Sequence, residues 1–164
     1  MKWLKSALAG IIGSLVMFIF LMIGINVTGF APFNVPPSAA LLTKLGLAVG
    51  PLPLIVHFGY GAFWSIAFLS IYKHRADIKK GLFLSVLLWL ILMVVYSPII
   101  GWGVFGFGAS AGELAVDAPL YLGSAIKYSV MTLLLHLVYG AIIGWLNPAW
   151  VDIGEGESIL DMAT

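Results

Sequence analysis

Four long apolar stretches divide the chain, over residues 6–29, 54–72, 81–102 and 124–146. A transmembrane helix needs about 20 apolar residues to cross the hydrocarbon core of a bilayer. None of these stretches alternates apolar and polar residues with a period of two, as a strand of a membrane β-barrel does. Because backbone groups in lipid must be hydrogen-bonded within their own segment, the pattern predicts four membrane-spanning helices.

The composition agrees with a lipid environment. The 164 residues are 62% hydrophobic and 9% charged, with a mean hydropathy of +1.09, whereas soluble domains carry about 25% charged residues. We therefore predict an all-α membrane protein with a single four-helix domain over residues 1–149 and an acidic tail over 150–164. The first apolar stretch is longer than the core of a signal peptide, so we expect it to be retained as a span. The absence of cysteine excludes disulfides and thiolate metal sites.

The basic residues indicate the orientation of the bundle. Six of the eight Lys and Arg residues lie before the first span or between the second and third, and the remaining two are Lys44 and Lys127. Since cytoplasmic loops carry the excess of Lys and Arg, both termini should be cytoplasmic. The tail with Asp152, Glu155, Glu157 and Asp161 would then be cytoplasmic too.

Proline and glycine mark breaks between and within the spans. In the proline-rich first outer loop we expect a short amphipathic helix near Ser38–Leu47. Pro98 should kink the third span near its outer end, and Asn147-Pro148 should end the fourth. Glu113 and Asp117, four residues apart in the second outer loop, would share one face of a second short helix.

A repeated motif, H-x-x-Y-G-A, begins at His57 and again at His136. Each copy opens the second span of a hairpin, which indicates two duplicated halves related by an axis along the membrane normal. Small residues follow both histidines at helical spacing: Gly61 and Ser65 after the first, Gly140 and Gly144 after the second. Such faces allow close helix packing, so we expect these four residues to draw the two halves together. The first span carries a similar face, with Ser6, Gly10 and Ser14.

The two histidines leave several interpretations open. Each could be a neutral imidazole that hydrogen-bonds to Tyr60 or Tyr139 of the other half, since ionisable groups in a membrane usually have a partner. They could be the axial ligands of a haem b, although close-packed helices leave little room for it. Too few ligands accompany them for a metal site. Finally, they could line a pocket for a small lipophilic ligand, such as a quinone or a lipid, formed by His57, Tyr60, Trp64, His136, Tyr139 and Asn26.

No nucleophile–base pair, metalloprotease motif or dinucleotide-binding motif is present in the sequence. There is also no basic patch large enough for a nucleic acid, and Lys127 is the one charged residue within a span. We therefore expect a non-enzymatic accessory or interaction subunit, surrounded by membrane lipids and forming a homo-oligomer or joining a membrane complex. The alternative is a binder or carrier of a lipophilic ligand at the level of His57 and His136.

The segment from His57 to Tyr139 resembles the YagU-like group of bacterial inner-membrane proteins. The resemblance rests on His57 followed by small residues, "YKHRADIKKGL", a span ending in "YSPIIGWG", and "HLVYG" at the start of the last span. It implies a small four-helix protein of the bacterial inner membrane. It implies no activity, cofactor or catalytic residue.

Overall fold

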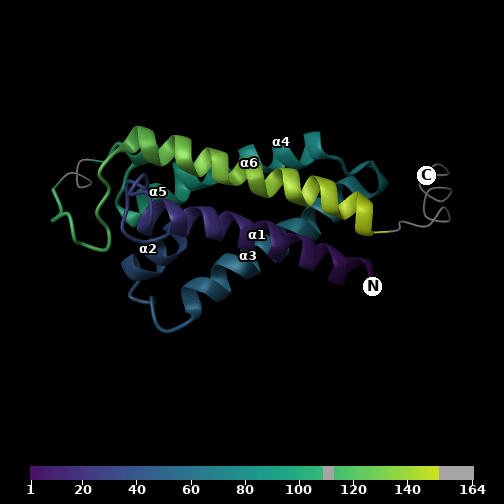
Figure 1. Ribbon diagram of the computed structural model, residues 1–164, viewed down its shortest axis with the longest axis horizontal. Helices are drawn as coiled ribbons and strands as arrows, with labels where there is room; N and C mark the ends of the chain where they lie inside the picture. Colours follow the sequence, from purple (N-terminus) through teal and green to yellow (C-terminus); the bar gives the residue numbers. More distant parts are fainter. Residues whose placement is uncertain (109–112, 152–164) are drawn as a thin grey trace.

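The computed structural model describes residues 1–108 and 113–151, and over these residues the chain is helical, without a named strand. Figure 1 shows a long bundle with the start of α1 and the end of α6 at the same end, here called the terminal end. The opposite end, here called the loop end, holds residues 27–51, 101–108 and 113–124. The helices are α1 (Lys2–Asn26), α2 (Pro37–Lys44), α3 (Leu52–Tyr72), α4 (Ile78–Ile91), α5 (Ser97–Ile100) and α6 (Ala125–Trp150).

The four predicted spans are confirmed as helices long and apolar enough to cross a membrane: Lys2–Asn26, Leu52–Arg75, Ile78–Ile100 and Ala125–Trp150. The first begins and ends earlier than predicted, and the fourth continues past Pro148. A proline inside a helix removes one hydrogen bond and crowds the carbonyl four residues earlier, which is why an end at Pro148 was expected. Val151 N–H donates to the Asn147 carbonyl at 2.9 Å, so the last turn closes around the proline. The acidic tail predicted over 150–164 lies outside the described residues from 152 onward.

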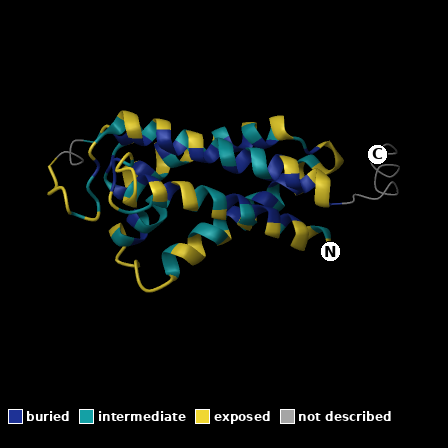
Figure 2. Cartoon of the chain, in the orientation of Figure 1, coloured by how far each residue is buried: buried dark blue, intermediate teal, exposed yellow. Residues whose placement is uncertain are grey.

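The long helices pack in the order α3, α1, α6, α4. The extensive contacts are those of α1 with α3, α1 with α6, and α4 with α6, while α3 meets α4 and α6 only briefly. Of the four spans, α6 is the most buried: half of its most apolar stretch lies inside the bundle. Figure 2 shows buried residues along the middle of the bundle, where α1 and α6 lie side by side, and exposed residues on its outer sides. The outermost helices, α3 and α4, therefore make little contact with each other.

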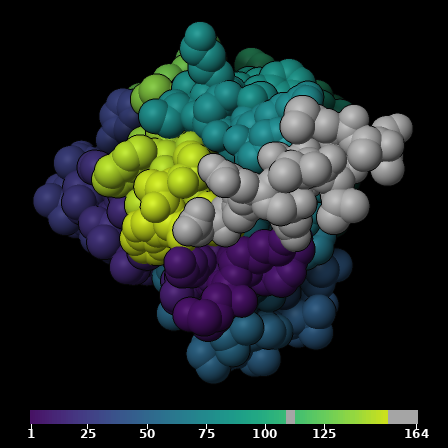
Figure 3. All heavy atoms as spheres, turned by 90° about the vertical axis from the view of Figure 1, so that its right-hand side faces the viewer, coloured from purple at the N-terminus to yellow at the C-terminus, as the bar shows by residue number. Residues whose placement is uncertain are grey.

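The helix starts have local sequence causes. Asp77 caps α4 by accepting a hydrogen bond from Lys80 N at 2.8 Å, and Ser124 caps α6 by accepting one from Lys127 N at 3.3 Å. Hydrogen bonds from the Lys80 side chain and backbone lower the pKa of the Asp77 carboxyl, so the cap stays ionised at neutral pH. Figure 3 views the terminal end, where the starts of α1 and α4 and the end of α6 lie together.

The two loops at the loop end are tied to each other. Phe33 forms an isolated bridge with Leu122, and its ring stacks on Trp102 with a centroid distance of 5.9 Å. Trp102 also packs edge-on against Tyr128 of α6 and donates from Nε1 to the Leu120 carbonyl at 2.9 Å. Because Trp102 is only 1% exposed, it joins both loops to the bundle.

The short helix predicted near Ser38–Leu47 is confirmed as α2, which ends earlier, at Lys44. Pro37 occupies its first turn, where a missing N–H has no cost. The prediction of a short helix that carries Glu113 and Asp117 is wrong, because residues 113–117 form turns.

Candidate functional site

A seam of small residues joins α1 to α3. Gly10 and Ser14 of α1 lie against Gly61 and Ser65 of α3, so close that a Cβ on Gly61 would collide with Ser14 Oγ. A Cβ on Gly10 would likewise meet the Gly61 carbonyl. The backbones of the two helices are therefore in direct contact, as small-residue faces allow in membranes.

A second seam joins α4 to α6. Gly81 and Ser85 of α4 lie against Gly140 and Gly144 of α6, and a Cβ on Gly140 would be 2.5 Å from the Gly81 carbonyl oxygen. We expected these faces to draw the two halves of the chain together, and this expectation is wrong. Each face packs within its own half of the chain. The face on α3 meets small residues of α1, and the face on α6 meets small residues of α4.

The two halves meet instead where α1 crosses α6. A Cβ on Gly13 of α1 would lie 2.9 Å from the Tyr139 ring of α6. The Tyr139 hydroxyl donates to the Gly61 carbonyl of α3 at 2.6 Å. A single tyrosine from the second half thus contacts both long helices of the first.

His57 bonds across helices to the main chain of α1. Its Nε2 lies 3.1 Å from the Ser14 carbonyl oxygen, and its ring packs against Phe18 and Phe58. The sequence suggested a tyrosine of the other half as the partner. A carbonyl takes this place because the glycine seam leaves the main chain of α1 accessible.

His136 bonds within its own helix. Its Nδ1 lies 2.7 Å from the Thr132 carbonyl oxygen, one turn earlier in α6, and the residue is 7% exposed. Here too the predicted tyrosine partner is wrong.

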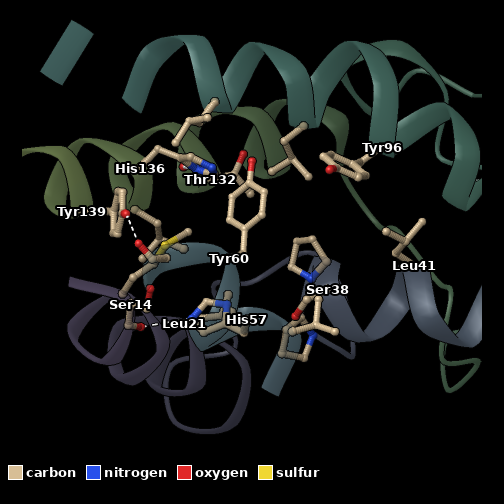
Figure 4. A pocket seen from close by; sticks show the side chains of 18 residues that line it. Ser14, Leu21, Ser38, Leu41, His57, Tyr60, Tyr96, Thr132, His136 and Tyr139 are labelled. Atoms are coloured by element: carbon tan, nitrogen blue, oxygen red, sulfur yellow. Dashed lines mark hydrogen bonds between the residues drawn. The ribbon is translucent and has the colours of Figure 1, made fainter. Parts of the chain in front are cut away.

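Both histidines line one cavity of about 170 Å³. Figure 4 shows Tyr60 reaching from α3 toward His136, with His57 near the start of the Tyr60 side chain. Most of the lining is apolar, and none of the described residues that form it is charged. The polar lining consists of Ser14, Ser38, His57, Tyr60, Tyr96, Thr132, His136 and Tyr139.

The cavity opens on the side where α3 and α4 separate. Its lining from α6 is buried, and Ser14 of α1 is 2% exposed. Val56 of α3, by contrast, is 37% exposed, and Tyr60 and Tyr96 are half-buried. Residues 36–41, which include the start of α2, cover the side toward the loop end. The opening therefore faces outward from the bundle, toward the medium that surrounds the apolar helices.

Tyr96 belongs to this site, although sequence reasoning did not select it. It ends a π-helical turn over Leu92–Tyr96, and Ser97 Oγ donates to the Leu92 carbonyl at 2.8 Å. The disturbance expected at Pro98 takes the form of this turn. The available sequence signal was Pro98, two residues further on, because prolines disturb the helix before them and π turns recur at functional sites.

Two predicted pocket residues lie elsewhere. Asn26 is at the exposed end of α1, where its amide donates to the Met22 carbonyl at 3.1 Å. Trp64 lies further along α3, packed against Tyr60 and Phe63, and is not part of the cavity lining. The pocket therefore keeps His57, Tyr60, His136 and Tyr139 from the predicted set.

A separate polar cluster, which the sequence analysis missed, fastens three helices nearer the terminal end. Ser6 Oγ of α1 donates to the Ser65 carbonyl of α3 at 2.8 Å. The fully buried Asn147 of α6 donates from Nδ2 to Ser65 Oγ at 3.0 Å. A polar amide beside a proline, at the end of an apolar span, is a signal that could have revealed it.

Across residues 1–108 and 113–151, no group of three or more His, Asp or Glu side chains is placed to hold a metal ion. The two histidines of the cavity also use one ring nitrogen each for a main-chain hydrogen bond. The chemistry that this arrangement can perform is hydrogen bonding to a small molecule in apolar surroundings.

Comparison with known proteins places the chain in a family. The sequence profile of that family, described as a family of unknown function, matches residues 1–153. No curated protein and no solved structure matches the chain. Because the match covers the whole described bundle, the chain belongs to the DUF6789 family.

Proposed function

We propose that this protein binds a small lipophilic molecule in the cavity between α3 and α4, with the polar headgroup of the molecule beside His57 and His136. The observation that carries the proposal is the convergence of both imidazoles and three tyrosines, Tyr60, Tyr96 and Tyr139, on one apolar cavity. Small-molecule sites are typically apolar concavities with a few convergent polar groups.

The size of the cavity limits the occupant. At about 170 Å³, it resembles an engineered apolar cavity of about 150 Å³ that binds benzene. The headgroup is therefore about one six-membered ring in size, and an attached tail would extend through the opening into lipid. This volume favours a quinone-like or other single-ring headgroup over haem b.

A role as an accessory or interaction subunit has less support. The small-residue faces that motivated it are already used inside the bundle, because Gly10 opposes Gly61 and Gly81 opposes Gly140. At these positions, no small-residue face remains free to pack closely against a second copy or a partner helix.

We further propose that the bundle arose by duplication. Gly10-x₃-Ser14 of α1 corresponds to Gly81-x₃-Ser85 of α4, and each packs on the helix that carries the H-x-x-Y-G-A motif. This pairing supports equivalence of α1 with α4 and of α3 with α6.

Both termini are proposed to be cytoplasmic, in a bacterial inner membrane as in the YagU-like proteins that the sequence resembles. Six of the eight Lys and Arg residues lie at the start of α1 or between the end of α3 and the first turn of α4, which supports this orientation. A cytoplasmic reporter fused after Thr164 should be active, and one inserted after Leu47 should be inactive. The reverse pattern would contradict the orientation.

Val56→Trp should fill the mouth of the cavity and abolish ligand retention. Val56 lines the cavity, whereas its neighbour Ile55 is 61% exposed and is absent from the lining, so Ile55→Trp is a matched control. Lipids that co-purify in a mild detergent are extracted and compared by mass spectrometry. We expect a lipophilic species to co-purify with wild type and with Ile55→Trp. With Val56→Trp its amount should fall at least about tenfold, which corresponds to a loss of about 1.4 kcal/mol or more in binding free energy.

The same variants are titrated with a decyl-substituted benzoquinone in lipid nanodiscs. Identical retention and identical affinity in all three proteins would contradict the proposed function.

A further inference from the structure

The main-chain partners of the two histidines fix their tautomers. A carbonyl oxygen can only accept a hydrogen bond, so the nitrogen facing it must carry the proton. His57 therefore holds its proton on Nε2, which faces the Ser14 carbonyl. His136 holds its proton on Nδ1, which faces the Thr132 carbonyl. A neutral imidazole has one such proton, and apolar burial favours the neutral form.

The remaining ring nitrogens are acceptors without a donor. These are Nδ1 of His57 and Nε2 of His136, and the hydrogen bonds of the described residues include none to either atom. Both rings line the same cavity; in Figure 4, His136 lies near the hydroxyl end of Tyr60 and His57 near the start of the Tyr60 side chain. The Tyr139 hydroxyl has also committed its proton, to the Gly61 carbonyl. Besides the Tyr60 and Tyr96 hydroxyls, the cavity thus presents two ring lone pairs that a donor-bearing ligand would satisfy.

We propose that the ligand is a donor: a single-ring headgroup with two hydroxyls, such as a quinol, and not the corresponding quinone. This inference rests on the proposed function and specifies its ligand class. A quinol donates one hydroxyl to His57 Nδ1 and the other to His136 Nε2. A quinone offers only acceptors: it could accept from the Tyr60 and Tyr96 hydroxyls, but it leaves both ring lone pairs unsatisfied, which is costly in an apolar site.

The tautomers are tested first, without ligand. The chain has three histidines, so the His74→Gln variant retains only the two in the cavity. Imidazole ¹⁵N spectra of this variant in nanodiscs should show one Nε2–H ring and one Nδ1–H ring. Assignment uses His57→Gln added to the same background. Two rings of the same tautomer, or doubly protonated rings at neutral pH, would overturn the proposal.

The ligand class is tested with three probes that share a decyl tail: a benzoquinol, the benzoquinone, and the bis-methyl ether of the quinol. Two net hydrogen bonds predict about tenfold or tighter binding of the quinol by wild-type protein than of either other probe. In His57→Leu and in His136→Leu the quinol advantage should shrink several-fold, while affinity for the ether stays within about twofold, because the ether donates no hydrogen bond to either ring.

The outcomes separate the two proposals. Equal affinity for all three probes, reduced by Val56→Trp, overturns the donor inference and leaves the cavity as a lipophile site. Tighter binding of the quinone also overturns the donor inference. Binding of none of the probes, together with no lipid retention, overturns the proposed function itself. Size-exclusion profiles that match wild type are required for each variant.

Discussion

Gly140→Leu should prevent the bundle from forming, whereas Gly59→Leu should leave it intact. At Gly140 even the first side-chain atom would be 2.5 Å from the main-chain oxygen of Gly81 and equally close to Ser85 Oγ. A backbone atom cannot rotate away, so α4 and α6 must separate. Overpacking costs up to about 3 kcal/mol even where side chains adjust, and we expect at least this loss in free energy of unfolding.

Gly59 is the matched control because it is exposed and a Cβ added there would have no heavy atom within 4 Å apart from its chain neighbours and the backbone of its own helix. Leucine at this position has a higher helix propensity than glycine, and its side chain would point out of the bundle. Gly61→Leu, two residues further along α3, should fail as Gly140→Leu does. Denaturation by SDS in mixed micelles, followed by circular dichroism, measures the difference. Equal midpoints for Gly140→Leu and Gly59→Leu would show that the seam is not a close contact.

His136→Ala is the comparison within the same helix. Its hydrogen bond returns to Thr132 of α6 itself, so its removal breaks no hydrogen bond between helices. Hydrogen bonds between membrane helices average only about 0.6 kcal/mol. We therefore expect His136→Ala to fold and to lose ligand affinity.

Trp102→Ala should release the loop end from the bundle. The ring lies between Phe33 and Tyr128 and is 1% exposed. Replacing a buried Trp by Ala costs about 3–5 kcal/mol, and the indole N–H bond to Leu120 is lost as well. Trypsin cleavage after Lys44, at the end of α2, should accelerate at least about tenfold, since opening of the loops exposes this site to the protease.

The control is Trp145→Ala, because Trp145 is 62% exposed on α6. It should change neither the free energy of unfolding by more than about 0.5 kcal/mol nor the cleavage rate. Unchanged cleavage in Trp102→Ala would contradict the role of this residue as the link between the two loops.

The spans could be predicted because hydrophobic length is a property of a single segment. The helix order could not, since it depends on which faces oppose one another. Small residues at Gly61 and Gly140 predict that some helix approaches closely. They do not say whether that helix belongs to the same half of the chain or to the other.

Part of the site was also accessible from sequence. The repeated motif placed His57, Tyr60, His136 and Tyr139 at one level, and all four line the cavity. Their hydrogen-bond partners were not predictable, because the two acceptors are main-chain carbonyls, which every residue carries. Tyr96 was missed because the π turn changes the helical register that a sequence pattern assumes.

The central position of the α1–α6 contact has a consequence for synthesis of the protein. The first span to leave the ribosome has as one main neighbour the last span, whose Tyr139 packs on Gly13. Until residues 125–150 enter the bilayer, α1 can pair only with α3, and the cavity lacks the wall that carries His136. The nascent chain therefore passes through a stage with one completed hairpin and an open flank, and only insertion of the last span completes the chamber.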